Sequence, residues 1–360
     1  MYGQERKRYA ALDIAKGIGI LLVVLGHCPQ VWLPVKQWIF SFHVPLFFLI
    51  AGMVWDRTSH EESGFLNGAF LAKKAIRLLE PCFLWGAGYM LARALVSRSF
   101  QPESVVWLLY NSQRSLSVPR AGSLTALWFL SCMFVTVCLF EGLQYLLRRA
   151  KQREGILLGL SLVFAALGLF LPRINVGYPW NVDIAMLGLA LMIWGSFAKS
   201  LLEKLEEKQW LCLLISLVSL AILTLTYRLN LQGLPDHYVD VSNRQFGNPA
   251  LFLLDALCGS VFVLSLSVFL SGFSLLQLPL CRMGRDTIPL LLIHKPVVLA
   301  MGVVFGKMAV SDPAAVAIEF LLAIVISEGI YVLTGPFFPF LYGESRRFGI
   351  ESGRNMSRYR

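Results

Sequence analysis

Three ionisable side chains lie in one apolar stretch near the N-terminus, LDIAKGIGILLVVLGHCPQ, residues 12–30. His27 is the residue type best suited to accept a proton near neutral pH, as general base catalysis requires. Lys16 precedes it by eleven residues. That spacing is about three helical turns and a rise of roughly 16 Å, so the two side chains share one helix face. Asp13 can pair with Lys16 at i,i+3. The pattern predicts a polar track with His27 near its outer end.

Further candidate residues lie near the ends of later apolar runs. His43 follows the first run closely, so its imidazole is expected near that of His27, as an orienting neighbour or as a structural residue. Lys74 and Arg77, in LAKKAIRLLEP, share a helix face and suit phosphate binding, or they are ordinary inner-surface charges. Other polar residues lie in or beside apolar runs. Each is expected either to line a polar pathway or to be a buried structural partner within the bundle. They are Trp128, Asp183, Asp255, His294, Lys295, Glu319 and Glu328.

The composition is that of a membrane protein. The chain is 56% hydrophobic and only 15% charged, whereas a soluble domain is about a quarter charged. Apolar runs of about 20 residues, the length that crosses a bilayer, alternate with short basic segments. The pattern predicts an all-α, polytopic membrane bundle. The net charge of +10 is spread over many short loops, so topology explains it better than nucleic-acid binding does.

About ten membrane-spanning helices are expected. Lys and Arg are concentrated in alternate loops, which places both termini in the cytoplasm. We expect one transmembrane domain over 1–342 and a basic cytoplasmic tail over 343–360. The predicted spans are 12–32, 38–55, 78–97, 123–147, 155–172, 180–198, 209–227, 249–272, 286–305 and 314–340.

The longest predicted outer loop, residues 228–248, is polar. It is either a solvated connector or part of a mouth that meets a polar acceptor outside the cytoplasm. Its polar side chains include Asp236, His237, Tyr238, Asp240, Asn243 and Arg244.

Several segments, in order along the chain, resemble acyltransferase family 3, which comprises bacterial integral-membrane O-acyltransferases. The resemblance covers nearly the whole chain. VDVSNRQFGNP is similar to the branch typified by fucose 4-O-acetylase-like proteins. The segments that carry the family resemblance are Asp13, Lys16 and Gly17 through His27, then FHVPLFFLIAG, LWFL and GRDTIPLLLIHKP.

The resemblance implies a multi-pass protein of the bacterial cytoplasmic membrane that uses acyl-CoA, by default acetyl-CoA, as a co-substrate. It implies no metal and no permanently bound cofactor. The acyl group would pass to a hydroxyl of an extracytoplasmic cell-envelope glycan or lipid-linked saccharide. The catalytic histidine of the family maps onto His27 and its basic partner onto Lys16. Its paired arginines map onto Lys74 and Arg77, where lysine replaces the first arginine and loses the bidentate fork.

His27 is therefore expected to be the general base, with Lys16 at the donor's phosphate or thioester and Asp13 fixing the Lys16 rotamer. The expected accessory residues are His43, Trp128, His294 and Glu328. The attack also requires an oxyanion stabiliser, which the pattern does not identify.

Two alternatives remain. An acyl-enzyme on Cys28 is disfavoured because neighbouring helix residues do not face each other. A membrane exporter of a glycan precursor would also place charges on an interior path. Many transporters contain internal repeats, and the sequence shows none.

Overall fold

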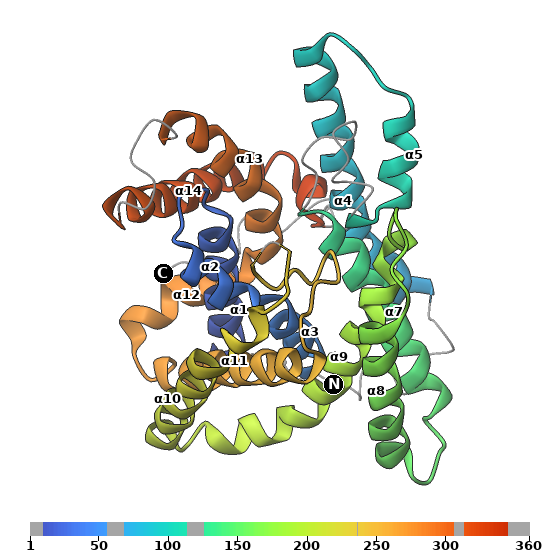
Figure 1. Ribbon diagram of the computed structural model, residues 1–360, viewed down its shortest axis with the longest axis vertical. Coiled ribbons are helices and arrows are strands. Elements are labelled where there is room, and N and C mark those ends of the chain that lie inside the picture. The colour runs from blue at the N-terminus through green and yellow to red at the C-terminus, as the bar shows by residue number, and fades with distance from the viewer. Residues whose placement is uncertain (1–9, 56–67, 114–125, 236, 306–312, 345–360) are drawn as a thin grey trace, which may run out of the picture.

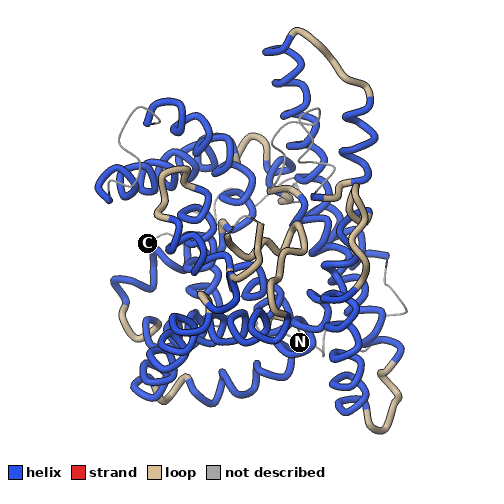
Figure 2. The backbone as a smooth tube through the Cα atoms, in the orientation of Figure 1, coloured by secondary structure: helices blue, strands red, loops and turns tan. Residues whose placement is uncertain are grey.

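The computed structural model describes residues 10–55, 68–113, 126–235, 237–305 and 313–344, and within these ranges the regular structure is helical, with no strand (Figures 1 and 2). The α-helices are α1 (Ala10–His27), α2 (Leu33–Phe40), α3 (His43–Met53), α4 (Gly68–Ser97), α5 (Glu103–Tyr110), α7 (Trp128–Leu146), α8 (Arg153–Phe170), α9 (Val182–Leu205), α10 (Gln209–Thr226), α11 (Pro249–Leu270), α12 (Ser274–Arg285), α13 (Thr287–Phe305) and α14 (Pro313–Thr334). Three short 3₁₀ helices are η1 (Pro179–Asn181), η2 (Leu229–Leu231) and η3 (Pro339–Tyr342).

The predicted class, an all-α polytopic membrane bundle, is confirmed. About ten spans are expected, and eight of them coincide, in the described residues, with segments that are long and apolar enough to cross a membrane. The other two predicted spans fall on α4 and α13. The 30-residue α4 carries several charges, among them Lys73, Lys74 and Arg77, and the apolar part of α13 is shorter, Thr287–Gly302. The eight are Ala10–His27, Leu33–Met53, Trp128–Leu146, Arg153–Phe170, Pro179–Leu205, Gln209–Leu231, Pro249–Leu270 and Pro313–Thr334.

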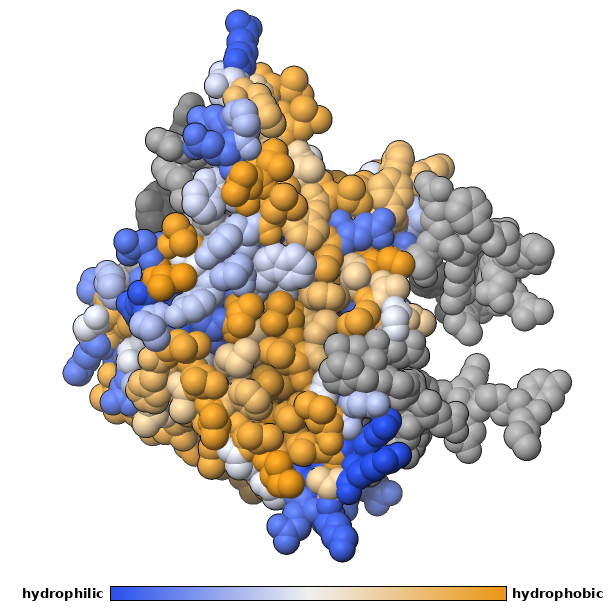
Figure 3. All heavy atoms as spheres, turned by 90° about the vertical axis from the view of Figure 1, so that its right-hand side faces the viewer, coloured by the Kyte–Doolittle hydropathy of each residue, from blue (hydrophilic) through white to orange (hydrophobic). Residues whose placement is uncertain are grey.

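The outer surface of the bundle is strongly apolar. Leu162 on α8, Leu225 on α10 and Val325 on α14 are each more than half exposed. On the face in Figure 3, apolar residues cover a broad region, and hydrophilic ones gather at the top, along the left edge and at the bottom. Apolar surface this extensive is typical of helices that face lipid.

Helix α1 lies inside the bundle. In Figure 1 the first three helices occupy the centre, with α13 and α14 above, α10 and α11 below, and α7, α8 and α9 to one side. Helix α1 contacts α11, α12 and α13, and most of its side chains are buried. Its ionisable residues are therefore held in the interior, where polar groups in a membrane protein usually have a function.

Two glycines bring α1 and α12 into backbone contact. A Cβ atom on Gly284 would lie 1.8 Å from the carbonyl oxygen of Asp13, and one on Gly17 would lie 2.2 Å from that of Leu280. Both distances are far below normal atomic contact, so neither position accepts a side chain without moving a helix. The crossing holds the turn of α1 that carries Asp13 and Lys16.

We expect Gly284→Ala to destabilise the protein, because forcing extra atoms into a packed interface typically costs about 1–3 kcal/mol. The measurement is the thermal unfolding temperature of the purified protein in detergent. Gly142→Ala is the matched control, since nothing lies within 4 Å of its Cβ position. Alanine also favours a helix there. Equal unfolding temperatures for the two variants would contradict the close crossing.

The second predicted span, 38–55, falls on the apolar segment Leu33–Met53, which is long enough to cross a membrane but is interrupted and not one continuous helix. Helix α2 ends at Phe40 and α3 begins at His43. Pro45, in the first turn of α3, has no N–H to donate to the Ser41 carbonyl, which favours a new helix start here. Irregular backbone at membrane depth is tolerated where protein buries it or where it borders a cavity. The break places His43 at the start of a helix.

Candidate active site

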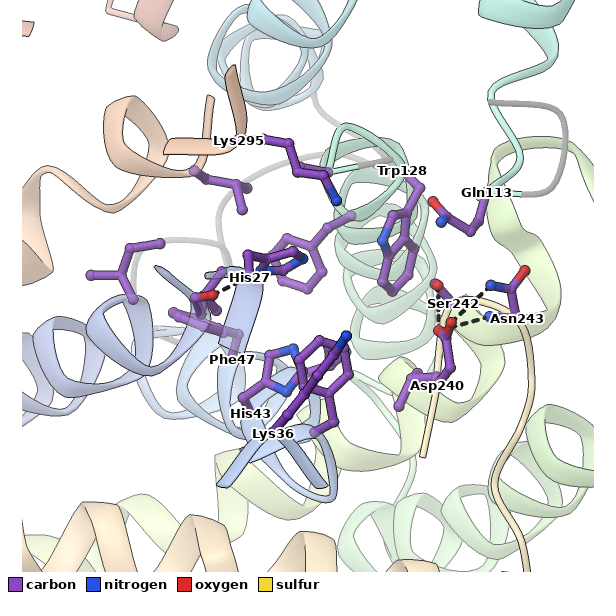
Figure 4. Close-up of a pocket in the computed structure, with 18 of the residues that line it drawn as sticks. His27, Lys36, His43, Phe47, Gln113, Trp128, Asp240, Ser242, Asn243 and Lys295 are labelled. Carbon is purple, nitrogen blue, oxygen red and sulfur yellow. Dashed lines mark hydrogen bonds between the residues drawn. The ribbon is translucent and has the colours of Figure 1, made fainter. Parts of the chain in front are cut away.

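A cavity of about 290 Å³ lies where α1, α2, α3, α7 and α13 approach the loop 228–248 (Figure 4). Its apolar lining includes Ile20, Val23, Phe47 and Leu291. An apolar cavity with a few convergent polar groups is the usual form of a small-molecule site. The polar lining residues are His27, Lys36, His43, Gln113, Trp128, Tyr238, Asp240, Ser242, Asn243, Thr287 and Lys295.

His27 presents a basic nitrogen to this cavity. Its Nδ1 lies 2.7 Å from the carbonyl oxygen of Val23, one helical turn earlier. A carbonyl only accepts hydrogen bonds, so Nδ1 carries a proton, and in the neutral ring Nε2 then keeps its lone pair. That tautomer is the one that a general base requires.

His43 lines the same cavity and is held in the same way, with Nδ1 3.0 Å from the Ile39 carbonyl. The ring of Phe40 lies between the two imidazoles, with its centroid 5.7 Å from that of His27 and 4.7 Å from that of His43. The interrupted second span thus brings a second imidazole to the site.

His294 packs against His27 on the side away from the cavity. It is fully buried and does not line the cavity, and its ring meets that of His27 edge-on with centroids 5.1 Å apart. Its Nδ1 lies 2.9 Å from the Leu290 carbonyl. Trp128, at the start of α7, lines the opposite part of the cavity (Figure 4).

Lys16 and Asp13 form the expected pair, with Lys16 Nζ 2.7 Å from Asp13 Oδ1. Neither residue lines the cavity. Between Lys16 and His27, α1 presents Ile20 and Val23 to the cavity, so the structure does not show the continuous polar track that the sequence predicts.

The residues expected to bind the donor lie apart from the cavity. Lys74 on α4 is half-buried, and its Nζ lies 5.3 Å from the centroid of the Phe70 ring. Arg77 is exposed one turn further along. Glu328 on α14 lies 3.5 Å from Arg282 and does not reach the cavity.

The loop 228–248 contributes Tyr238, Asp240, Ser242 and Asn243 to the cavity, so the structure favours the mouth over the solvated connector. The carboxylate of Asp240 accepts hydrogen bonds from the Ser242 hydroxyl and from the backbone N–H of Asn243 at 3.1 Å. Its other oxygen accepts one from the side-chain amide of Asn243 at 2.8 Å. The carboxylate is thereby held in one orientation.

Arg244 anchors this loop to the bundle. Its Nη1 donates to Asp183 Oδ2 at 2.9 Å, and its Nη2 donates to the Leu171 carbonyl at 2.7 Å. Both side chains of the ion pair are almost fully buried. The guanidinium of Arg173 donates in turn to the Arg244 carbonyl. The loop is therefore attached to the start of α9 and to the segment that follows α8.

No motif or spacing in the sequence marks Lys36, Gln113, Ser242 or Thr287, which also line the cavity. Lys36 reaches the cavity because α2 is a separate short helix, and its Nζ lies 4.5 Å from the centroid of the Tyr238 ring. Gln113 has no local signal in the sequence. Its backbone N–H donates to the buried Asn181 side chain at 2.9 Å, a contact that only the fold creates.

The fold and this cavity define a multi-pass membrane protein with a histidine at an interior site. The acyltransferase domain of acyltransferase family 3 matches residues 9–332, so the chain belongs to that family and is a membrane acyltransferase.

The chain is also similar to the nodulation protein NolL of Sinorhizobium fredii, with 28% identity over 183 residues. That match covers 48% of this chain and 47% of the relative, so it spans about half of each protein. No solved structure matches. The similarity to the fucose 4-O-acetylase-like branch stays a prediction.

Proposed function

We propose that this protein moves an acyl group, by default acetyl, from acyl-CoA at the cytoplasmic side to a hydroxyl of an extracytoplasmic glycan or lipid-linked saccharide. It would work in the bacterial cytoplasmic membrane with no permanently bound cofactor. The observation that carries the proposal is His27, whose Nδ1 donates to Val23 and whose ring lines an interior cavity bordered by a polar loop. Family membership favours this enzyme over an exporter.

In the proposed reaction, Nε2 of His27 removes the proton from the acceptor hydroxyl as its oxygen attacks the thioester carbonyl carbon. The C–S bond then breaks, and the imidazolium returns the proton to the sulfur of CoA. A base in position contributes typically about 10²–10⁴-fold to the rate. The edge of His294 and the carbonyl of Val23 support this role, since they hold the His27 ring in one orientation.

Direct transfer is favoured over an acyl-enzyme on Cys28. The Cys28 thiol is buried, lies 3.4 Å from the Val24 carbonyl and is not among the residues that line the cavity. An acceptor hydroxyl bound in the cavity would lie beside His27 and could attack the thioester directly, so no covalent acyl-enzyme is needed.

The loop side of the cavity suits a sugar acceptor. Tyr238 and Trp128 provide aromatic surface for the faces of sugar rings, and Asp240 and Asn243 provide polar groups for hydroxyls. The distribution of Lys and Arg predicts that this loop lies outside the cytoplasm, which agrees with an acceptor in the cell envelope.

The donor would bind on the other side, with Lys74 and Arg77 holding the CoA phosphates. Its pantetheine arm would run from α4 toward His27. Lys16, held by Asp13, would provide positive charge for the donor on the inner part of α1.

Acetyl-CoA binding tests the donor assignment without knowledge of the acceptor. We expect purified wild type in detergent to bind acetyl-CoA saturably, and Lys74→Ala/Arg77→Ala to lose this binding because the phosphates lose their ion partners. His27→Ala should keep it. The measurement is calorimetric titration of each folded variant.

Arg149→Ala/Lys151→Ala is the matched control, because it removes the same two charges from another exposed basic segment. Equal loss of binding in both double variants would show a nonspecific charge effect. An absence of acetyl-CoA binding by folded wild type would overturn the donor assignment and favour the exporter.

A further inference from the structure

Lys295 places an ammonium group beside His27, inside the membrane-spanning part of the bundle. It lies in α13 directly after His294 and lines the cavity. In Figure 4 its side chain extends into the space between His27 and Trp128. A lysine at such depth is costly unless it faces a polar cavity, and it usually marks a functional site.

No carboxylate in the described part of the chain forms an ion pair with Lys295. The nearby carboxylate of Asp240 is bound by Ser242 and Asn243 instead. The three N–H donors of the ammonium are therefore available to a group that enters the cavity.

The turn that carries Lys295 is tied to α4 by a hydrogen bond. Pro296 lacks an N–H, which leaves the carbonyl of Leu292 without its helical partner. The hydroxyl of Tyr89, on α4, donates to that carbonyl at 3.1 Å. Lys295 thus projects from a turn of α13 that is tied to the helix carrying the proposed donor-binding residues.

Attack of a hydroxyl on a thioester needs a donor aimed at the developing oxyanion. Several other donors in the cavity are already engaged. Ser242 and Asn243 bind Asp240, and the hydroxyl of Thr287 donates to the Gly284 carbonyl at 2.8 Å. Lys36 is held over the rings of Phe40 and Tyr238. This leaves Lys295 as the cationic donor in front of His27.

We propose that Lys295 is the oxyanion-stabilising residue of the acyl transfer, an inference that rests on the proposed function. As the acceptor oxygen bonds to the acyl carbon and its proton passes to His27, the carbonyl electron pair moves onto oxygen. The ammonium of Lys295 donates a hydrogen bond to that oxyanion. The pair then re-forms the C=O bond, the C–S bond breaks, and the CoA sulfur takes the proton from His27.

Two CoA analogues test this role without an acceptor. Trifluoroacetonyl-CoA forms a tetrahedral hydrate that resembles the intermediate, whereas acetonyl-CoA keeps a planar ketone that resembles the substrate. We expect wild type to bind the trifluoro analogue more tightly. Removing one oxyanion donor from an enzyme typically costs about 10²–10³-fold in rate. The ratio of the affinities for the trifluoro analogue and for acetonyl-CoA should therefore be at least about tenfold smaller in Lys295→Met than in wild type. The affinity of Lys295→Met for acetonyl-CoA should be unchanged.

Lys36→Met is the matched control, because it removes a second cavity lysine whose ammonium faces aromatic rings. Its preference for the trifluoro analogue should equal that of wild type. Lys295→Arg, which keeps a cationic donor, should retain part of the preference.

The outcomes separate the two proposals. If wild type binds neither analogue, the acyl-CoA donor assignment fails and this inference fails with it. If wild type binds both and Lys295→Met keeps the preference, only the oxyanion role is overturned. An equal loss of affinity for both analogues in folded Lys295→Met would instead place the ammonium on another part of CoA and overturn the role.

Discussion

Replacing His27 by glutamine is expected to reduce acyl transfer by about 10²–10⁴-fold, the contribution typical of a general base in position. Glutamine can still donate a hydrogen bond to the Val23 carbonyl, but it cannot accept a proton in the transition state. The measurement is the rate at which membranes supplied with acetyl-CoA, labelled in the acetyl group, incorporate label into envelope glycan or lipid-linked saccharide.

His43→Gln is the matched control for this change. His43 lines the same cavity and its Nδ1 is bound to a carbonyl one turn earlier, as that of His27 is. The Phe40 ring separates it from His27, so we expect a smaller loss. Incorporation at the wild-type rate in folded His27→Gln, or an equal loss in both variants, would contradict the assignment of His27 as the base.

Hydropathy was enough to predict the fold class, because lipid allows few alternatives to helices for an apolar run of about 20 residues. It did not predict the break before His43. That break depends on Pro45 and on packing around the cavity. Hydropathy averaged over a window of about 20 residues is sensitive to neither. The span predicted over 78–97 shows a related limit of hydropathy, because it coincides with α4, which is not among the eight strongly apolar segments. Its charges, including Lys74 and Arg77, lower its hydropathy although it forms a 30-residue helix.

Helix geometry predicts that Lys16 and His27 share one face of α1. It does not predict how far the cavity extends along that face. The cavity reaches Ile20 and Val23 on α1 but not Lys16, and residues from other helices and from the loop 228–248 complete its walls. Gln113 and Asp240 reach it from segments that are far apart in the chain. Such long-range contacts leave no local pattern, so a single sequence can point to His27 and Lys295 but cannot assemble the cavity around them.

Breaking the ion pair between Asp183 and Arg244 is expected to have the largest effect on stability. Removing one partner of a buried pair leaves an uncompensated charge and costs about 3–5 kcal/mol. Asp183→Asn leaves Arg244 buried with a neutral neighbour, so its thermal unfolding temperature in detergent should fall sharply. The control is Asp286→Asn. Its partner Arg282 is half exposed and 3.8 Å away, and such pairs contribute about 0–1 kcal/mol.

A double variant separates the cost of an unpaired buried charge from the cost of changing the side-chain packing at this site. Asp183→Leu/Arg244→Met removes both charges, so it should be less destabilised than Asp183→Asn, because no buried charge remains unpaired. If Asp183→Asn is as stable as Asp286→Asn, the pair does not hold the loop.

The same pair links stability to the acceptor side of the site. Arg244 follows Ser242 and Asn243 in the chain, and its attachment to α9 holds the loop that carries Asp240 and Tyr238. Loss of that attachment should increase amide hydrogen exchange in residues 237–248. Acyl transfer should fall with it, whereas acetyl-CoA binding should persist in the protein that remains folded. A parallel loss of binding would mean that the loop also supports the donor side.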